Sequence, residues 1–152
     1  MSDRSNLIAD LEAGYRELQQ VAEGVADDKM TAVWFGEWSA KDILAHAASW
    51  DEFAGLDFQR IGRGHTPCLA AFREADVNDW NGFLMRPRKL FSLAQVRFES
   101  GHCHQQLLDA LDGLPEAVFA PGNMPAAFLA ITIGHYRSHA GNIRQWRQKE
   151  GL

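Results

Sequence analysis

The chain has 152 residues, with 20 acidic and 15 basic side chains and a formal net charge of -5. Hydrophobic residues make up 46% and charged residues 23%, which are ordinary proportions for one globular domain with a single core. An acidic chain of this kind lacks the positive surface on which generic nucleic-acid binding depends. We therefore expect one domain across residues 1–152 and no nucleic-acid partner.

The first residues, MSDRSNLIADLE, contain no apolar signal core, and no run approaches the ~18 apolar residues of a membrane span. We therefore expect a cytoplasmic protein with no membrane partner. The two cysteines, Cys68 and Cys103, are expected to be free thiols in a reducing compartment. A disulfide between them is the alternative.

Helical spacing of apolar residues predicts two main helices in the first part of the chain. The first covers about residues 4–25 and ends in a polar loop, which leads into the aromatic segment VWFGEWS. The second begins after Ser39, an N-cap residue type with Asp42 three positions later, and extends to about Arg60. The tryptophans are expected to fill the core and the helix ends.

Residues 61–89 are irregular, with a short helix at about residues 76–84 that Pro87 separates from the next main helix. This third main helix begins after Ser92, and a fourth covers about residues 126–149 with Pro125 in its first turn. Strand-like alternation never persists. The sequence therefore predicts an all-α four-helix bundle with a long crossover between helices two and three.

Two histidines stand four residues apart in the fourth predicted helix, His135 and His139. This spacing places both imidazoles on one helix face, and neutral imidazoles so placed can bind one ion. The face is predicted to be the buried one, because it belongs to an apolar stripe: Phe128, Ile131, Thr132, His135, His139, Asn142, Ile143 and Trp146.

A third histidine, His46, lies between Ile43 and Trp50 at helical spacing, so it also belongs to an inward face. Three nitrogen donors are the number of protein ligands expected of a catalytic metal site with an open position. We expect His104 to be packed in the core or exposed, although it could be a fourth ligand. His65 is expected to be a solvated loop residue.

Tyr136 follows His135, so the general-base glutamate of the H-E-x-x-H zinc-protease motif is absent. The candidate acid or base groups are four carboxylates on the second and third helices, and each of them is also explained as a solvated helix residue: Asp51, Glu52, Asp57 and Glu99. The catalytic residues therefore stay unassigned.

Over nearly its whole length the chain resembles the DinB/YfiT-like superfamily of four-helix bundles, and within it the ClbS/DfsB-type branch. The motifs that carry the resemblance are WSAKDILAHAASWDEF at residues 38–53 and TIGHYRSHAGNIRQW at residues 132–146. DVNDWNGFL at residues 76–84 and SLAQVRFESGHCHQQLLDAL at residues 92–111 support it.

The resemblance implies an up-up-down-down bundle with a divalent metal, zinc or nickel, held by His46, His135 and His139. Such families include metal-dependent hydrolases and thiol-dependent transferases, so we expect a metal-dependent enzyme of one of these types acting on a small molecule. A homodimer is also expected. The rival interpretations are a non-catalytic protein that captures a small molecule or toxin, and a bundle whose histidines form a structural hydrogen-bonded cluster.

Overall fold

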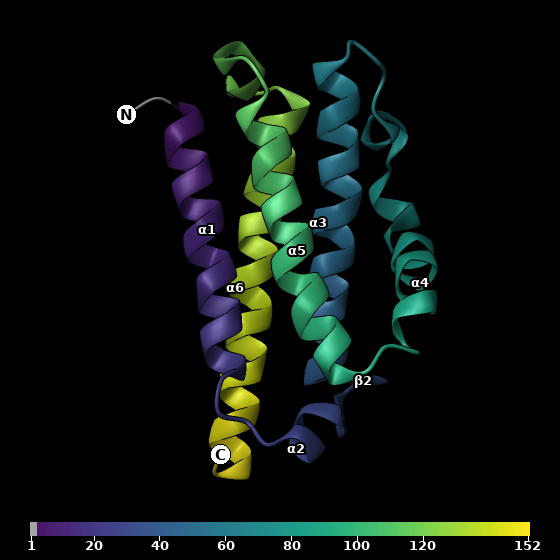
Figure 1. Cartoon of the computed structure of the whole chain (residues 1–152), viewed down its shortest axis with the longest axis vertical. Helices are drawn as coiled ribbons and strands as arrows, with labels where there is room; N and C mark the ends of the chain where they lie inside the picture. Colours follow the sequence, from purple (N-terminus) through teal and green to yellow (C-terminus); the bar gives the residue numbers. More distant parts are fainter. Residues whose placement is uncertain (1–2) are drawn as a thin grey trace. The chain divides into compact units, whose positions relative to one another are not determined.

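The computed structural model describes residues 3–152, which form two compact units. Unit 1 consists of the residues up to Ile43 together with Glu116–Leu152, and unit 2 consists of Leu44–Pro115. Within residues 3–152 there are six α-helices, three short 3₁₀ helices and one two-stranded hairpin (Figure 1). No helix in this described range is long and apolar enough to cross a membrane.

The elements of unit 1 come from both ends of this range, and α3 passes from unit 1 into unit 2 after Ile43. In chain order the bounds are α1 Asp3–Ala22, α2 Asp27–Thr31, β1 Val33–Phe35, β2 Trp38–Ser39, α3 Ala40–Gly62, η1 Cys68–Ala71, η2 Glu74–Asp76, α4 Val77–Arg88, α5 Leu93–Asp112, η3 Glu116–Phe119 and α6 Met124–Glu150.

The predicted helix starts are confirmed by their capping bonds. The Ser39 amide and hydroxyl both donate to the Asp42 carboxylate, and the Asp42 amide donates back to the Ser39 hydroxyl. Ser92 and Gln95 form the equivalent reciprocal pair at the start of α5. These side chains satisfy backbone N–H groups that the first turn of a helix leaves without partners, so the sequence alone locates the starts of α3 and α5.

In unit 1, α1 and α6 lie side by side and run in the same direction (Figure 1). Asp10 accepts a hydrogen bond from Arg137 at 3.4 Å, and Glu17 accepts one from Arg144 at 2.7 Å. Residues later in α1 thus contact residues later in α6, as expected for parallel helices. Further on, the guanidinium of Arg147 donates to the carbonyl of Val21, in the last turn of α1, at 2.9 Å.

The core of unit 1 is centred on Tyr136, whose side chain is fully buried. Its ring meets Tyr15 edge-on, with ring centroids 6.0 Å apart. Gly14 of α1 packs against the Tyr136 ring, and a Cβ atom at this position would lie 3.4 Å from it, an ordinary van der Waals distance. Leu18 and Leu129 add fully buried apolar side chains.

In unit 2, α3 and α5 also run in the same direction. Asp51 lies next to His104, and Gly55 lies against Leu107, where a Cβ atom on the glycine would come within 3.5 Å of the Leu107 backbone. Two parallel neighbours need a long connection, because the chain must return to the end at which the first helix began. The crossover of η1, η2 and α4 provides that return, as predicted.

The all-α class and the crossover are thus confirmed, but the order of helix directions differs from the prediction. An up-up-down-down order makes the first and last main helices antiparallel, whereas α1 and α6 are parallel within unit 1. It also makes the second and third main helices antiparallel, whereas α3 and α5 are parallel within unit 2. The physical reason lies in the crossover, which returns the chain before α5 begins.

Three local elements also differ from the prediction. Residues assigned to a polar loop form α2, which Met30 anchors with a fully buried side chain. The aromatic segment forms the β1–β2 hairpin, turning at Gly36, whose φ of +59° suits a residue without a Cβ atom. The short helix of the crossover runs through Pro87 to Arg88, because a proline near the end of a helix removes only one late backbone bond.

Candidate metal centre

In unit 1, α6 presents two histidines one helical turn apart. The Nε2 atoms of His135 and His139 are 3.0 Å apart, and the ring centroids are 4.5 Å apart. An i, i+4 interval places two side chains on the same side of a helix, so the sequence interval brings the rings together. Without an ion, one Nε2–H donates to the other Nε2, which fixes opposite tautomers in the two rings.

The same separation suits two ligands of one divalent ion. With metal–nitrogen bonds of about 2.0–2.1 Å and a tetrahedral angle, two ligand nitrogens lie about 3.3 Å apart. The observed distance between the two Nε2 atoms is 3.0 Å. Moving the two Nε2 atoms about 0.3 Å further apart would therefore give the spacing of two ligands on a single ion.

Both imidazoles are held in the neutral form at pH 7. Burial, with a smaller contribution from neighbouring His139, lowers the pKa of His135 to about 4. Burial also lowers the pKa of His139. The neutral ring is the form that binds a metal, so near neutral pH an ion would not have to displace a proton from an imidazolium. The ring that carries the shared Nε2–H would only have to change to the Nδ1–H tautomer.

The buried face of α6 is rotated from the predicted stripe. Leu129 and Tyr136 are fully buried, whereas Ile131, which the sequence placed in the stripe, is 68% exposed. Tyr136 takes the centre of the face because it packs on α1 through Tyr15. As a result His139 is buried and His135 is half-buried, so the pair lies at the edge of the buried face.

The β1–β2 hairpin brings aromatic side chains to the same part of α6. Trp34 stacks on Trp146 with ring centroids 4.8 Å apart and an interplanar angle of 3°. Phe35 meets His139 edge-on, with centroids 6.1 Å apart. The buried indole N–H of Trp34 has no hydrogen-bond acceptor among residues 3–152. These contacts were not predicted from the sequence; a signal was available in Gly36–Glu37, a two-residue turn between short apolar runs.

His46 lies in unit 2, in the second turn of α3. Its side chain is buried, as the spacing from Ile43 and Trp50 predicted. Its backbone carbonyl accepts a hydrogen bond from the Ser49 hydroxyl at 2.7 Å. The ring offers one nitrogen ligand, either Nδ1 or Nε2.

His65 and His104 lie in environments that the sequence analysis predicted or allowed. His65 and His102 are exposed. His104 is buried in unit 2, where its Nδ1 atom lies 3.5 Å from a carboxylate oxygen of Asp51, itself fully buried. His104 therefore belongs to a buried acid–imidazole pair. Both cysteines are free thiols, as predicted.

Asp57, one of the four candidate acid or base groups, has a structural role in unit 2. Its fully buried carboxylate accepts the backbone N–H groups of Cys68 at 2.9 Å and Leu69 at 2.6 Å, and Arg60 donates to it at 2.6 Å. These amides open η1, so Asp57 fastens the start of the crossover to α3. It is not the solvated helix acid that its sequence position also allowed.

Arg88 forms ion pairs with two further candidate acid or base groups, Glu52 and Glu99. Its side chain is only 6% exposed and donates to Glu52 at 2.6 Å, to Glu99 at 2.9 and 3.1 Å, and to the carbonyl of Leu84 at 3.1 Å. Burial, followed by the charges of Glu99 and Glu52, raises the pKa of the nearby Cys103 thiol to about 12. Sequence reasoning missed Arg88, because an arginine in the run RPRK has the pattern of a solvated basic residue.

The sequence profile of the DinB superfamily matches residues 10–143, a range that includes all three candidate histidines. The chain belongs to the DinB superfamily. An uncharacterised protein from Escherichia coli UTI89 has a similar solved structure, with a TM-score of 0.81 and 9% sequence identity over 98% of this chain and 95% of that chain. At that identity the likeness shows the DinB-like fold alone. No curated protein matches the chain.

The pKa of His135 predicts how the stability of this DinB-superfamily protein depends on pH when no metal is present. The unfolded chain protonates His135 near pH 6.5 and the folded chain near pH 4, so the unfolded state holds more protons between these values. The free energy of unfolding should therefore fall as the pH is lowered through this window, by about 2 kcal/mol from this group at pH 5.

Urea denaturation of the chelator-treated protein at pH 7.5 and pH 5 measures this dependence. His135→Gln should lose less stability over that interval than the unmodified protein, while His65→Gln, which alters an exposed loop histidine, should lose the same amount. Equal losses in all three proteins would show that His135 titrates normally in the folded state.

Proposed function

We propose that the protein is a metal-dependent enzyme acting on a small molecule, in which His46, His135 and His139 bind one divalent ion. The observation that carries the proposal is the 3.0 Å separation of the His135 and His139 Nε2 atoms. A pair of neutral imidazoles at this distance matches two neighbouring ligands of one ion, and members of the DinB superfamily are generally metal-binding.

His46 is the proposed third ligand. Its side chain is buried on an inward face of α3, and one of its ring nitrogens can bind a metal ion. His46 also occupies the first ligand position of the W-S-x-K-D-x-L-x-H motif. Buried imidazoles need a hydrogen-bond partner or a metal, and three histidine ligands leave an open coordination position. Zinc and nickel both suit a set of nitrogen donors.

A divalent ion bound in this way supplies Lewis acidity and lowers the pKa of a bound water, towards about 7 for zinc in favourable sites. The protein's own contribution is to keep His135 and His139 neutral and close together. Hydrolase or thiol-dependent transferase chemistry fits such a site, and we assign the chain to the ClbS/DfsB-type branch on its motifs.

One observation favours the second candidate function, capture of a small molecule without turnover. The four candidate acid or base carboxylates already have partners in unit 2: Asp51 with His104, Asp57 with η1, and Glu52 and Glu99 with Arg88. A general base drawn from this set would have to leave a hydrogen-bonded pair. A capture protein needs no such base.

The metal content of protein purified without an affinity tag or added metal tests the proposed site. Elemental analysis should find about one equivalent of a divalent ion, and a chelator should lower the melting temperature, because an ion that binds only the folded state stabilises it. An unchanged melting temperature after exhaustive chelation, with no uptake of zinc or nickel on titration, would leave the histidines as a structural cluster.

A further inference from the structure

The aromatic residues of the β1–β2 hairpin lie beside His139 in unit 1, and they indicate what kind of molecule the site accepts. We propose that Phe35 is an apolar wall of the ligand-binding site, so that the bound small molecule places a flat aromatic or similarly apolar group against it. This inference rests on the proposed function, because it takes the His135–His139 pair as the metal-binding end of the same site.

The position of Phe35 is the first argument. Its ring centroid is 6.1 Å from that of His139, and the two rings are nearly perpendicular at 81°. Phe35 remains 37% exposed despite its ring contacts with His139 and Trp34. A single exposed phenylalanine is ordinary on a protein surface, but this one is in direct contact with a proposed metal ligand. A ligand bound at the pair would therefore lie close to the phenyl ring.

The rigidity of the hairpin is the second argument. Trp34 stacks face to face on Trp146 of α6, and its ring centroid is 5.6 Å from that of Phe35. At the other end of the hairpin, the amide and hydroxyl of Ser39 donate hydrogen bonds to the Asp42 carboxylate at the start of α3. Phe35 is therefore held between two anchored positions, so little conformational entropy is lost when a ligand packs against it.

Two hydroxamic acids provide matched probes of the proposed wall. Acetohydroxamate and benzohydroxamate bind metals through the same pair of oxygen atoms and differ only in a methyl or a phenyl group. Titrations of the cobalt(II)-loaded protein, followed by the cobalt absorption bands, should show benzohydroxamate binding about tenfold more tightly, as expected when an aromatic ring packs on Phe35.

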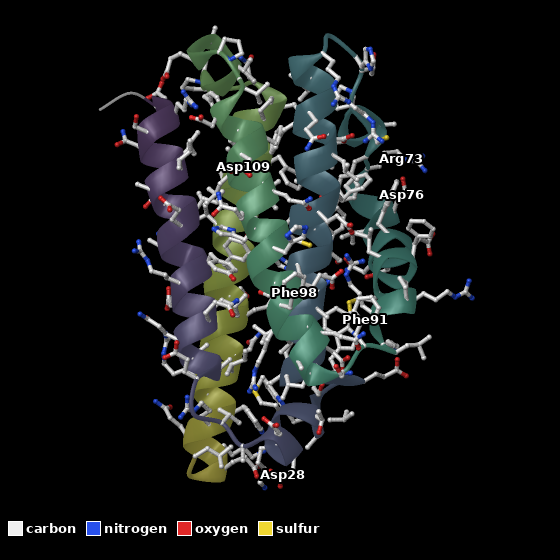
Figure 2. The ribbon with its side chains drawn as sticks, viewed as in Figure 1. Asp28, Arg73, Asp76, Phe91, Phe98 and Asp109 are labelled. Atoms are coloured by element: carbon white, nitrogen blue, oxygen red, sulfur yellow. The ribbon has the colours of Figure 1, made fainter. Side chains whose placement is uncertain are left out.

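Phe35→Ala should reduce this preference to about twofold or less and leave the affinity for acetohydroxamate unchanged. Phe98→Ala is the matched control, since it makes the same substitution at an exposed phenylalanine of unit 2 on α5 (Figure 2). The control variant should retain the full preference.

The outcomes separate this inference from the proposed function. If the unmodified protein binds cobalt but shows no preference for benzohydroxamate, or if Phe35→Ala retains the preference, the wall is not Phe35. If the preference falls equally in Phe35→Ala and Phe98→Ala, the contact with the ring is nonspecific and the inference is also wrong. A protein that takes up neither cobalt nor zinc nor nickel overturns the proposed function, and the inference with it.

Discussion

Replacing His135 by alanine is expected to weaken divalent-metal binding by at least about 100-fold, because the loss of a direct ligand should exceed the 10- to 100-fold cost of losing a group that only supports a ligand. The remaining ring, His139, would lose the neighbour whose Nε2 atom lies 3.0 Å away. The fold should survive, since His135 lies at the edge of the buried face and Tyr136 supplies the centre of the core.

Elemental analysis and competition with a chromophoric chelator measure this effect. His46→Ala should behave like His135→Ala if His46 is the third ligand. His65→Ala, at an exposed loop position, should bind metal as the unmodified protein does. Unchanged metal content in a correctly folded His135→Ala protein would contradict the proposed site, and unchanged content in His46→Ala alone would remove only the third ligand.

Replacing Asp57 by asparagine is expected to lower the free energy of unfolding by about 3 kcal/mol. The Asp57 carboxylate accepts hydrogen bonds from the N–H groups of Cys68 and Leu69 and from the guanidinium of Arg60. Asparagine has the same shape, but its NH2 group is a donor and would point at one of these donors. A buried donor would then be left unsatisfied. Urea denaturation measures the loss, and hydrogen exchange at the Leu69 amide reports whether the crossover opens locally.

Asp76→Asn is the control for this prediction. Asp76 also accepts from an arginine three residues away, Arg73, at 2.8 and 2.9 Å, but the pair lies on the surface where η2 leads into α4 (Figure 2). Exposed pairs contribute ~0–1 kcal/mol, so this variant should lose less than that. Equal losses in the two variants would argue against a special role for Asp57.

The main helices could be predicted because their signals are local. Ser39 with Asp42 and Ser92 with Gln95 locate two helix starts through bonds between residues three apart in the chain. The hairpin was missed because its strands cover only Val33–Phe35 and Trp38–Ser39, too short for an alternating pattern. Which way each helix runs depends on contacts between distant segments, and no local pattern reports these.

The histidine pair was also predictable, because an i, i+4 interval fixes its geometry once the segment is helical. The phase of the buried face was not, since the placement of Ile131 outside it depends on how Tyr136 packs against α1. The roles of Asp57 and Arg88 were equally hidden. Each has partners that are distant in the chain, 11 and 12 residues away for Asp57 and 11 and 36 residues away for Arg88.

The two units are built from the chain in different ways, and this bears on how the protein folds. Unit 2 is one continuous stretch, Leu44–Pro115, whereas unit 1 joins the segment before it to Glu116–Leu152. Contacts between α1 and α6 therefore close a loop of more than a hundred residues, such as the pair of Asp10 and Arg137 at a separation of 127. During synthesis α1 emerges long before α6, so the contacts between them can form only after all residues of unit 2 have been made. The His135–His139 pair then belongs to the part of the protein that is completed last.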